Sequence, residues 1–108
     1  DLEKILDIPG VVAPSIACTD LAKQLGHPFD PDHPDVWKII DDAVKMADKR
    51  NKAIRANTSY PFTTMEANIQ RIKHLHDHGV KIIGLQTDFF LLYCAGKEVL
   101  DGVRKLIA

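Results

Sequence analysis

The sequence predicts an α/β fold with a parallel sheet, built from three consecutive βα units. Three apolar, β-rich runs span Val11–Ala17, Lys52–Thr58 and Val80–Gln86, and a segment with helical periodicity follows each of them. Strands that alternate with helices pair in parallel, because a right-handed crossover returns each strand in the same direction. The 108 residues are fewer than half of the roughly 250 that a complete eight-stranded α/β barrel needs. We therefore expect residues 1–108 to form a single partial domain.

The first unit contains a short helical turn and a longer helix. Leu2–Ile8 is typical of the end of a helix that precedes the first strand, and Asp20–Leu25 forms the turn after it. Residues 27–34 contain three prolines and cannot continue a helix. The main helix is predicted over Asp35–Lys49, where apolar side chains fall on one face and charged ones on the other, as expected of a helix that packs on a sheet.

The other two units also have clear helix signals. A capping box, with Thr63 as the N-cap and Glu66 three residues later, predicts the start of the next helix, and Gly79 predicts its end. The last helix is predicted over Asp88–Ile107. The expected buried residues are Met65, Ile69, Ile72 and His76 in the former, and Leu92, Ala95, Val99, Val103 and Leu106 in the latter.

Composition and charge exclude several kinds of partner. Fourteen basic and fifteen acidic residues give a formal net charge of −1, which provides no electrostatic attraction for nucleic acid or for an anionic membrane. No apolar run approaches the roughly 20 residues of a membrane span, and the start of the chain lacks a signal peptide, so we expect a cytoplasmic protein. Cys18 and Cys94 lack the spacing of a metal site and are expected to be reduced packing thiols.

Functional residues are expected just after the three strands, because sites in parallel α/β folds lie at the carboxyl ends of the strands. Asp20 follows the first strand and opens a helical turn, where a carboxylate can bind a divalent cation or cap the helix. Asp88 has the same two possibilities after the third strand, and capping or complementing the helix dipole is favoured there.

Histidines occur in two clusters. His74 and His78 are four residues apart and could share a metal ion, but both project opposite the predicted apolar face, which favours surface histidines. His76 leans toward the apolar side and is expected to be a packing histidine. In the proline-rich loop, His27 and His33 could either serve the structure of the loop or contribute to a neighbouring pocket.

Arg55 lies within a predicted strand, where a buried guanidinium needs carboxylate partners. It could bind an anionic substrate or form an internal ion pair, and the sequence leaves both possibilities open. Trp37, Phe29 and Tyr60 are expected to be packing residues rather than stacking platforms for bases, because no basic patch accompanies them.

Several motifs resemble the HpcH/HpaI aldolase family. Residues 9–27 are similar to its G-V-D-x-x-x-I-G-P-x-D-L-x-x-x-x-G pattern, with D-L-x-x-x-x-G at Asp20–Gly26, and His33–Val36 matches its H-P-E-V. Asn51–Ala53 resembles the G-K-A that precedes strand seven of the family, and Gly79–Leu92 resembles G-x-x-x-x-x-V-G-x-D-x-x-L-L. The resemblance covers nearly the whole chain in register.

The resemblance implies that the chain corresponds to the last three βα units of a TIM (β/α)₈ barrel. The family cleaves 4-hydroxy-2-oxo acids to pyruvate and an aldehyde, with Mg²⁺, Mn²⁺ or Co²⁺ as a Lewis acid that chelates the pyruvate unit. Asp20 then matches the metal-binding aspartate, and Cys18 and Thr19 occupy positions whose backbone N–H groups face the pyruvate unit. Implied partners are a small 2-oxo acid and either further copies of the chain or an N-terminal barrel segment.

Departures from the family pattern limit this expectation. Ala17 and Cys18 replace the usual Gly-Pro, and Arg55–Thr58 replaces the apolar end of strand seven, which changes the pocket wall. The family's glutamate ligand, catalytic arginine and base-supporting histidine come from earlier strands, so we expect little aldolase activity from these 108 residues alone. The alternative is a non-catalytic α/β module that self-associates. A flavodoxin-like nucleotide domain is disfavoured, because no glycine-rich phosphate loop follows any strand.

Overall fold

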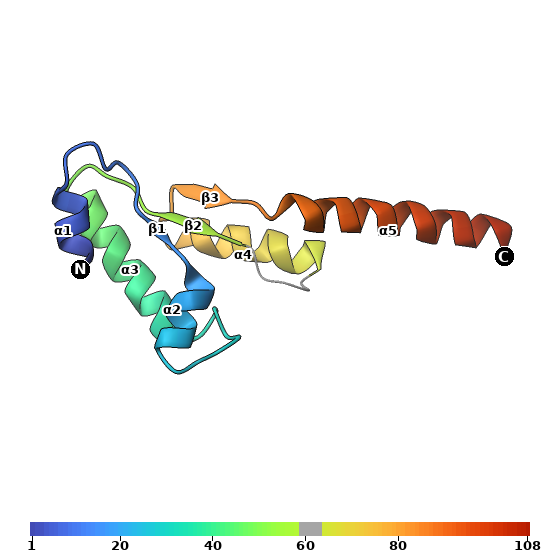
Figure 1. Cartoon of the computed structure of the whole chain (residues 1–108), viewed down its shortest axis with the longest axis horizontal. Helices are drawn as coiled ribbons and strands as arrows, with labels where there is room; N and C mark the ends of the chain where they lie inside the picture. Colours follow the sequence, from blue (N-terminus) through green and yellow to red (C-terminus); the bar gives the residue numbers. More distant parts are fainter. Residues whose placement is uncertain (59–63) are drawn as a thin grey trace.

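The computed structural model describes residues 1–58 and 64–108 and confirms the predicted α/β fold (Figure 1). After an initial helix, each strand is followed by helix, with two helices after the first strand and one after each of the others, so all three βα units are present. The elements in chain order are α1 (Leu2–Asp7), β1 (Ser15–Ile16), α2 (Cys18–Gln24), α3 (Pro34–Asp48), β2 (Arg55–Asn57), α4 (Met65–Asp77), β3 (Ile82–Gly84) and α5 (Asp88–Ile107).

The three strands form one parallel sheet in the order β1-β2-β3. Ala56 in the central strand pairs with Ile16 on one side and Ile83 on the other. The regular strands are shorter than predicted, but the ladder extends beyond β1, because the Ala53 N–H donates to the Val12 carbonyl at 3.0 Å. Parallel strands that follow one another in sequence order are the arrangement found in a sector of a TIM barrel.

The hydrophobic core lies on one face of this sheet. Along β2, Ala56 is buried between Arg55 and Asn57, which are only half-buried, so the two faces differ as period-two alternation requires. Helices α1, α3 and α4 contribute Leu6, Ile40 and Leu75 to the covered face. The opposite face carries Arg55, Asn57 and the exposed Ile82, and it is the face that a complete barrel would enclose.

The start of α4 differs from the predicted capping box. Thr64 is the N-cap, and its side chain accepts a hydrogen bond from the Ala67 N–H at 3.1 Å. Glu66 does not reach back to the cap; its carboxylate accepts a hydrogen bond from the Gln70 side chain at 2.9 Å. Thr63 lies outside the described residues.

The predicted buried face of α4 was wrong. Asn68, Arg71 and Leu75 are the buried residues of this helix, whereas Met65 is 44% exposed and Ile69 54% exposed. The inward polar residues of α4 make hydrogen bonds to other segments, as buried polar groups require. The Asn68 side-chain amide donates to the Leu85 carbonyl at 2.9 Å, so α4 turns polar residues toward the sheet.

Helix α5 has its predicted bounds, but its apolar stripe is uncovered among the described residues. Phe90 is the buried residue of this helix, while Leu92 is 74% exposed and Leu106 87% exposed. The helix extends away from the sheet (Figure 1). The Cα radius of gyration is therefore 17.0 Å, against about 13 Å for a compact domain of this length. Within residues 1–58 and 64–108, no helix combines the length and apolarity needed to cross a membrane.

Thr58 provides a test of the hydrogen-bond network between β2, β3 and α4. Its side chain is 1% exposed, and its hydroxyl donates to the Leu85 carbonyl. We expect Thr58→Val to lower the free energy of unfolding by about 1–3 kcal/mol, because the valine leaves a buried carbonyl with fewer donors. Chemical denaturation of both proteins measures this difference.

Thr87→Val is the matched control. The Thr87 hydroxyl oxygen is also buried, but it has no hydrogen-bond partner among the described residues. Its removal should leave stability unchanged or raise it, since a buried polar atom without a partner is unfavourable. Equal effects of the two substitutions would contradict the role assigned to Thr58.

Candidate functional site

A hollow of about 160 Å³ lies at the carboxyl ends of β1 and β2. It contains all three site residues expected from the sequence, at the start of α2, together with residues from the proline-rich loop, β2 and α4. The lining residues are Ala17, Cys18, Thr19, Asp20, Pro31, Asn57 and Arg71. The hollow thus brings together parts of two consecutive βα units.

Asp20 is the third residue of α2, because the helix begins at Cys18, two residues earlier than predicted. Ala17 is the N-cap residue, and it has no side chain able to cap the helix. The Asp20 side chain is exposed and makes no hydrogen bond or ion pair with any residue that the structure describes. Capping therefore does not account for Asp20, and its carboxylate is available to a ligand.

Cys18 and Thr19 are the first two residues of α2. Their backbone N–H groups have no acceptor within the helix, as in the first turn of any α-helix. The Cys18 side chain is buried, and burial raises the pKa of its thiol, which stays protonated. Cys18 and Cys94 are both free cysteines. Cys18 thus contributes to packing and presents a backbone N–H group at the start of α2.

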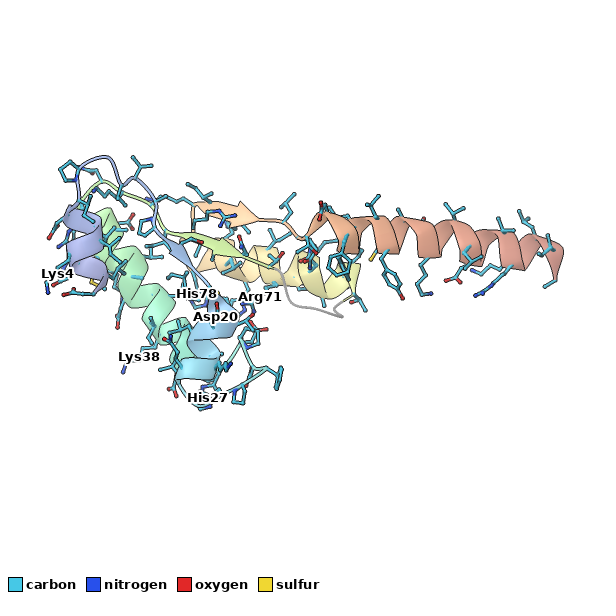
Figure 2. All side chains as sticks on the ribbon, in the orientation of Figure 1. Lys4, Asp20, His27, Lys38, Arg71 and His78 are labelled. Atoms are coloured by element: carbon cyan, nitrogen blue, oxygen red, sulfur yellow. The ribbon has the colours of Figure 1, made fainter. Side chains whose placement is uncertain are left out.

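Arg71 is a site residue that the sequence reasoning missed. Its side chain is only 9% exposed and donates hydrogen bonds to the Asp32 carboxylate and, at 3.5 Å, to the Pro31 carbonyl. Its guanidinium carbon lies 5.5 Å from the ring centroid of Trp37. Figure 2 shows Arg71 and Asp20 converging near the start of α2. The spacing of Asn68, Arg71 and Leu75 is the helical signal that could have identified it.

Asn57 adds an unpaired polar group to the same hollow. Its side-chain oxygen is buried and has no hydrogen-bond partner among the described residues. Gly84 lies beside it in register, and a Cβ on Gly84 would approach the Asn57 Cγ to 3.1 Å. The absence of a side chain at Gly84 therefore leaves space for the Asn57 amide.

Arg55 and Asp88 lie outside the lining of the hollow. The Arg55 side chain donates to the Ser15 hydroxyl at 3.1 Å, on the sheet face opposite the core. The contact with Ser15 does not distinguish between the two roles left open for Arg55, which are binding an anionic substrate and forming an internal ion pair. Asp88 accepts a hydrogen bond from the Phe89 N–H at 2.8 Å at the start of α5, in agreement with the favoured role at a helix start.

The histidines of α4 agree with the expectations only in part. His74 is exposed, as expected of a surface histidine, whereas His78 is half-buried. His74 and His78 stack on Trp37 of α3, with ring centroids 4.1 and 4.6 Å away, and the His78 ring is 2.5 Å from the Asp41 carboxylate. Both rings face α3, because α4 is rotated about its own axis relative to the orientation that its apolar residues predict. The side chain of His76, expected to pack, is instead 80% exposed.

Of the aromatic residues that were expected to pack, one is buried and one is exposed. Trp37 is a packing residue, as expected, with 8% of its surface exposed. Phe29 is 79% exposed in the loop, so it is not part of the core. Tyr60 lies outside the described residues.

In the loop before α3, His33 has a structural role. It is the N-cap of the helix, and its ring accepts a hydrogen bond from the Asp35 N–H at 3.2 Å. His27 contacts the Asp35 carboxylate at 2.9 Å, and the two histidine rings stack on each other. Neither histidine lines the hollow that contains Asp20.

Gly84 provides a test of the pocket wall. We expect Gly84→Ala to lower the free energy of unfolding by about 1–3 kcal/mol, because the added methyl group displaces the Asn57 amide. Thermal and chemical denaturation measure the effect. In Gly96→Ala, the matched control within α5, the methyl group meets no atom within 4 Å. That control should gain about 0.5–1 kcal/mol from helix propensity, so a similar gain in Gly84→Ala would contradict this assignment.

Comparison with known proteins finds a related aldolase. A curated 4-hydroxy-2-oxo-heptane-1,7-dioate aldolase from Klebsiella pneumoniae subsp. pneumoniae is 33% identical over 100 residues. The match covers 93% of this chain, which spans 34% of the length of that aldolase. No family model matches the chain.

Solved structures with the same fold cover this chain almost completely. A HpcH/HpaI aldolase/citrate lyase family protein from Burkholderia cenocepacia J2315 has a TM-score of 0.78 and 24% identity, and the match covers 95% of this chain and 37% of that protein. The citrate synthase SbnG has a TM-score of 0.70 and 17% identity, with 96% and 39% covered. These likenesses show the fold, which is that of a partial TIM barrel.

The sequence motifs, the order of the strands in the sheet and the sequence match with the aldolase all indicate a sector of a barrel. Three parallel βα units correspond to little more than a third of the length of each relative, as expected for a sector of an eight-unit barrel. The resemblance inferred from the motifs is confirmed: the chain is similar in sequence to a 4-hydroxy-2-oxo-heptane-1,7-dioate aldolase, and its fold matches part of the barrel of an HpcH/HpaI aldolase/citrate lyase family protein.

Proposed function

We propose that this chain contributes the metal-binding aspartate of a carbon–carbon lyase site, where a divalent cation assists retro-aldol cleavage of a 4-hydroxy-2-oxo acid to pyruvate and an aldehyde. The observation that carries the proposal is the Asp20 carboxylate, which lies beside the hollow and has no partner within the described ranges. The 33% identity to an aldolase over nearly the whole chain supports the same class of reaction.

The Asp20 carboxylate is a suitable type of ligand for a hard divalent cation, but a single ligand is too few to hold one. A carboxylate oxygen suits Mg²⁺ or Mn²⁺, and Co²⁺ also accepts it, but these ions take about six ligands. The proposed site is therefore completed by substrate, by water and by residues outside the part of the barrel that this chain covers. When bound, the cation would act as a Lewis acid that stabilises negative charge on the keto oxygen of the substrate.

Three groups of the chain itself suit a 2-oxo acid. We assign the free N–H groups of Cys18 and Thr19 to the carboxylate of the pyruvate unit, because they adjoin the hollow and lack helical acceptors. Arg71 lines the same wall and is the third group; because Asp32 balances its charge, it would act through its N–H groups and not through a net positive charge. Because Asp32 and Trp37 already hold Arg71 in place, little side-chain entropy is lost on binding.

Exchange of the pyruvate methyl protons for deuterium tests this proposal. The protein for this assay carries the chain together with the remaining βα units of a related barrel, and NMR follows the exchange in D₂O with Mn²⁺. We expect exchange that Asp20→Ala slows by at least about tenfold, because loss of even an outer partner of a bound metal commonly costs 10–100-fold.

Asp42→Ala is the control for the change in charge. Asp42 is an exposed residue of α3 that forms an ion pair with Lys45 at 3.9 Å, and it does not line the hollow. This variant should keep the full exchange rate. Absence of exchange in the completed barrel, or an unchanged rate in Asp20→Ala, would overturn the proposed function.

The second candidate function is self-association without catalysis, and it rests on α5. The apolar stripe of this helix is exposed, with Val99 68% and Val103 45% exposed in addition to Leu92 and Leu106. Isolated apolar side chains are common on protein surfaces, but a continuous stripe along a 20-residue helix is typical of an interaction surface. We propose that copies of the chain cover this stripe in one another.

Sedimentation analysis tests self-association. We expect concentration-dependent oligomers of the chain and a shift to monomers in the double variant Leu92→Glu and Val103→Glu, because burying two carboxylates is unfavourable. Lys105→Glu changes the charge on the outer face of the same helix and should leave the oligomers intact. A chain that stays monomeric at all concentrations would rule out this candidate.

A further inference from the structure

Two histidines and an aspartate converge where the proline-rich loop meets α3. His27 Nε2 lies 2.9 Å from Asp35 Oδ2, and His33 Nδ1 lies 3.5 Å from the same oxygen. One ligand atom from each of the three residues falls within 4.8 Å of the other two. Figure 2 places His27 at the opposite end of α2 from Asp20, so this cluster is separate from the hollow.

We propose that His27, His33 and Asp35 bind a divalent transition-metal ion of the zinc class. Imidazole nitrogens and a carboxylate oxygen are typical Zn²⁺ ligands, at about 2.0–2.2 Å from the ion. Tetrahedral coordination at these lengths separates neighbouring ligand atoms by about 3.3 Å. The present separations of the two histidine nitrogens from Asp35 Oδ2, 2.9 and 3.5 Å, lie on either side of that value. Coordination would also require the stacked rings to turn toward the ion, and His33 Nδ1 to exchange the hydrogen bond that it accepts from the Asp35 N–H for a bond to the metal.

The loop holds its two histidines in place before any ion binds. The His27 N–H donates to the Ala22 carbonyl at 2.9 Å, and the His33 N–H donates to the Asp30 carbonyl at 3.2 Å. Pro28, Pro31 and Pro34 further restrict the backbone between the histidines and at the helix start. Such restriction lowers the entropic cost of bringing the ligands together.

The contact between His27 and Asp35 also suits a cation. The Asp35 carboxylate accepts a hydrogen bond from His27 Nε2 at 2.9 Å, so the two ligand atoms already face each other. A bound ion would replace that hydrogen, and the imidazole would then carry its proton on Nδ1. The Asp35 side chain is 60% exposed, which leaves the fourth coordination position to water.

Ion binding would change the arrangement of the two rings in a detectable way. The imidazole rings now stack with centroids 3.4 Å apart and planes 13° from parallel. A ring nitrogen coordinates in the plane of its ring, so two parallel planes have to converge on a shared ion. The bound ion would also restrict the motion of the loop whose Pro31 and Asp32 contact Arg71. It would thereby stabilise one wall of the hollow.

Zinc titration of the chain, purified without a polyhistidine tag and freed of metal by a chelator, tests the site. Co²⁺ serves as a coloured probe of tetrahedral coordination, and imidazole nitrogen NMR identifies the histidines. We expect one Zn²⁺ per chain, shifted signals from His27 and His33, and a melting temperature that rises with zinc concentration. His27→Gln should weaken zinc binding by at least about tenfold.

Two further variants separate ligand loss from unfolding. His33→Asn keeps an N-cap side chain for α3 while it removes the imidazole, and should also lose zinc affinity. His76→Gln removes an exposed histidine of α4 and should bind zinc normally, as should His74→Gln. Unchanged affinity in both His27→Gln and His33→Asn, or a loss of affinity in His74→Gln, would overturn the proposal. Because Asp20 lies outside the zinc cluster, failure here leaves the proposed lyase function untouched.

Discussion

The parallel pairing of the three strands determines where every other element lies. Parallel neighbours need a long crossover, and right-handed crossovers between strands in sequence order place consecutive helices on one face of the sheet. Ala56 is therefore buried under helices, whereas Arg55 and Asn57 point to the other face. The carboxyl ends of the strands also share one edge, so Asp20 of the first unit lies in the same hollow as Asn57 of the second.

Arg71 links this edge to the helical layer. A buried guanidinium is unfavourable unless charged and polar groups compensate it, and here Asp32, the Pro31 carbonyl and the face of Trp37 do so. These contacts join α4 to α3 and to the loop that follows α2. The shape of the hollow thus depends on residues that are distant from Asp20 in the sequence, and the same loop also positions His27 and His33.

The features predicted correctly depend on local patterns. The βα repeats, the bounds of α5 and the place of Asp20 after the first strand follow from periodicity and residue type over a few turns of chain. The errors concern contacts between distant segments. The sequence pattern assigned Met65 and Ile69 to the buried face of α4, but this helix turns Asn68 inward, where it donates to the Leu85 carbonyl together with Thr58. The role of Arg71 likewise depends on Asp32, 39 residues away.

The candidate site divides into a part that this chain provides in full and a part that it shares. The groups that we assign to an anionic 2-oxo acid in the proposed function are the N–H groups at the start of α2, and one sector of the barrel positions them beside Arg71. Coordination of a cation at Asp20 needs ligands from elsewhere, since one carboxylate is too few. Arg55 depends on its surroundings in the same way, because a hydroxyl of Ser15 does not balance a guanidinium that a closed barrel would bury. Closing the barrel around this sheet face would therefore set both the metal affinity of Asp20 and the role of Arg55, while substrate recognition would already be in place.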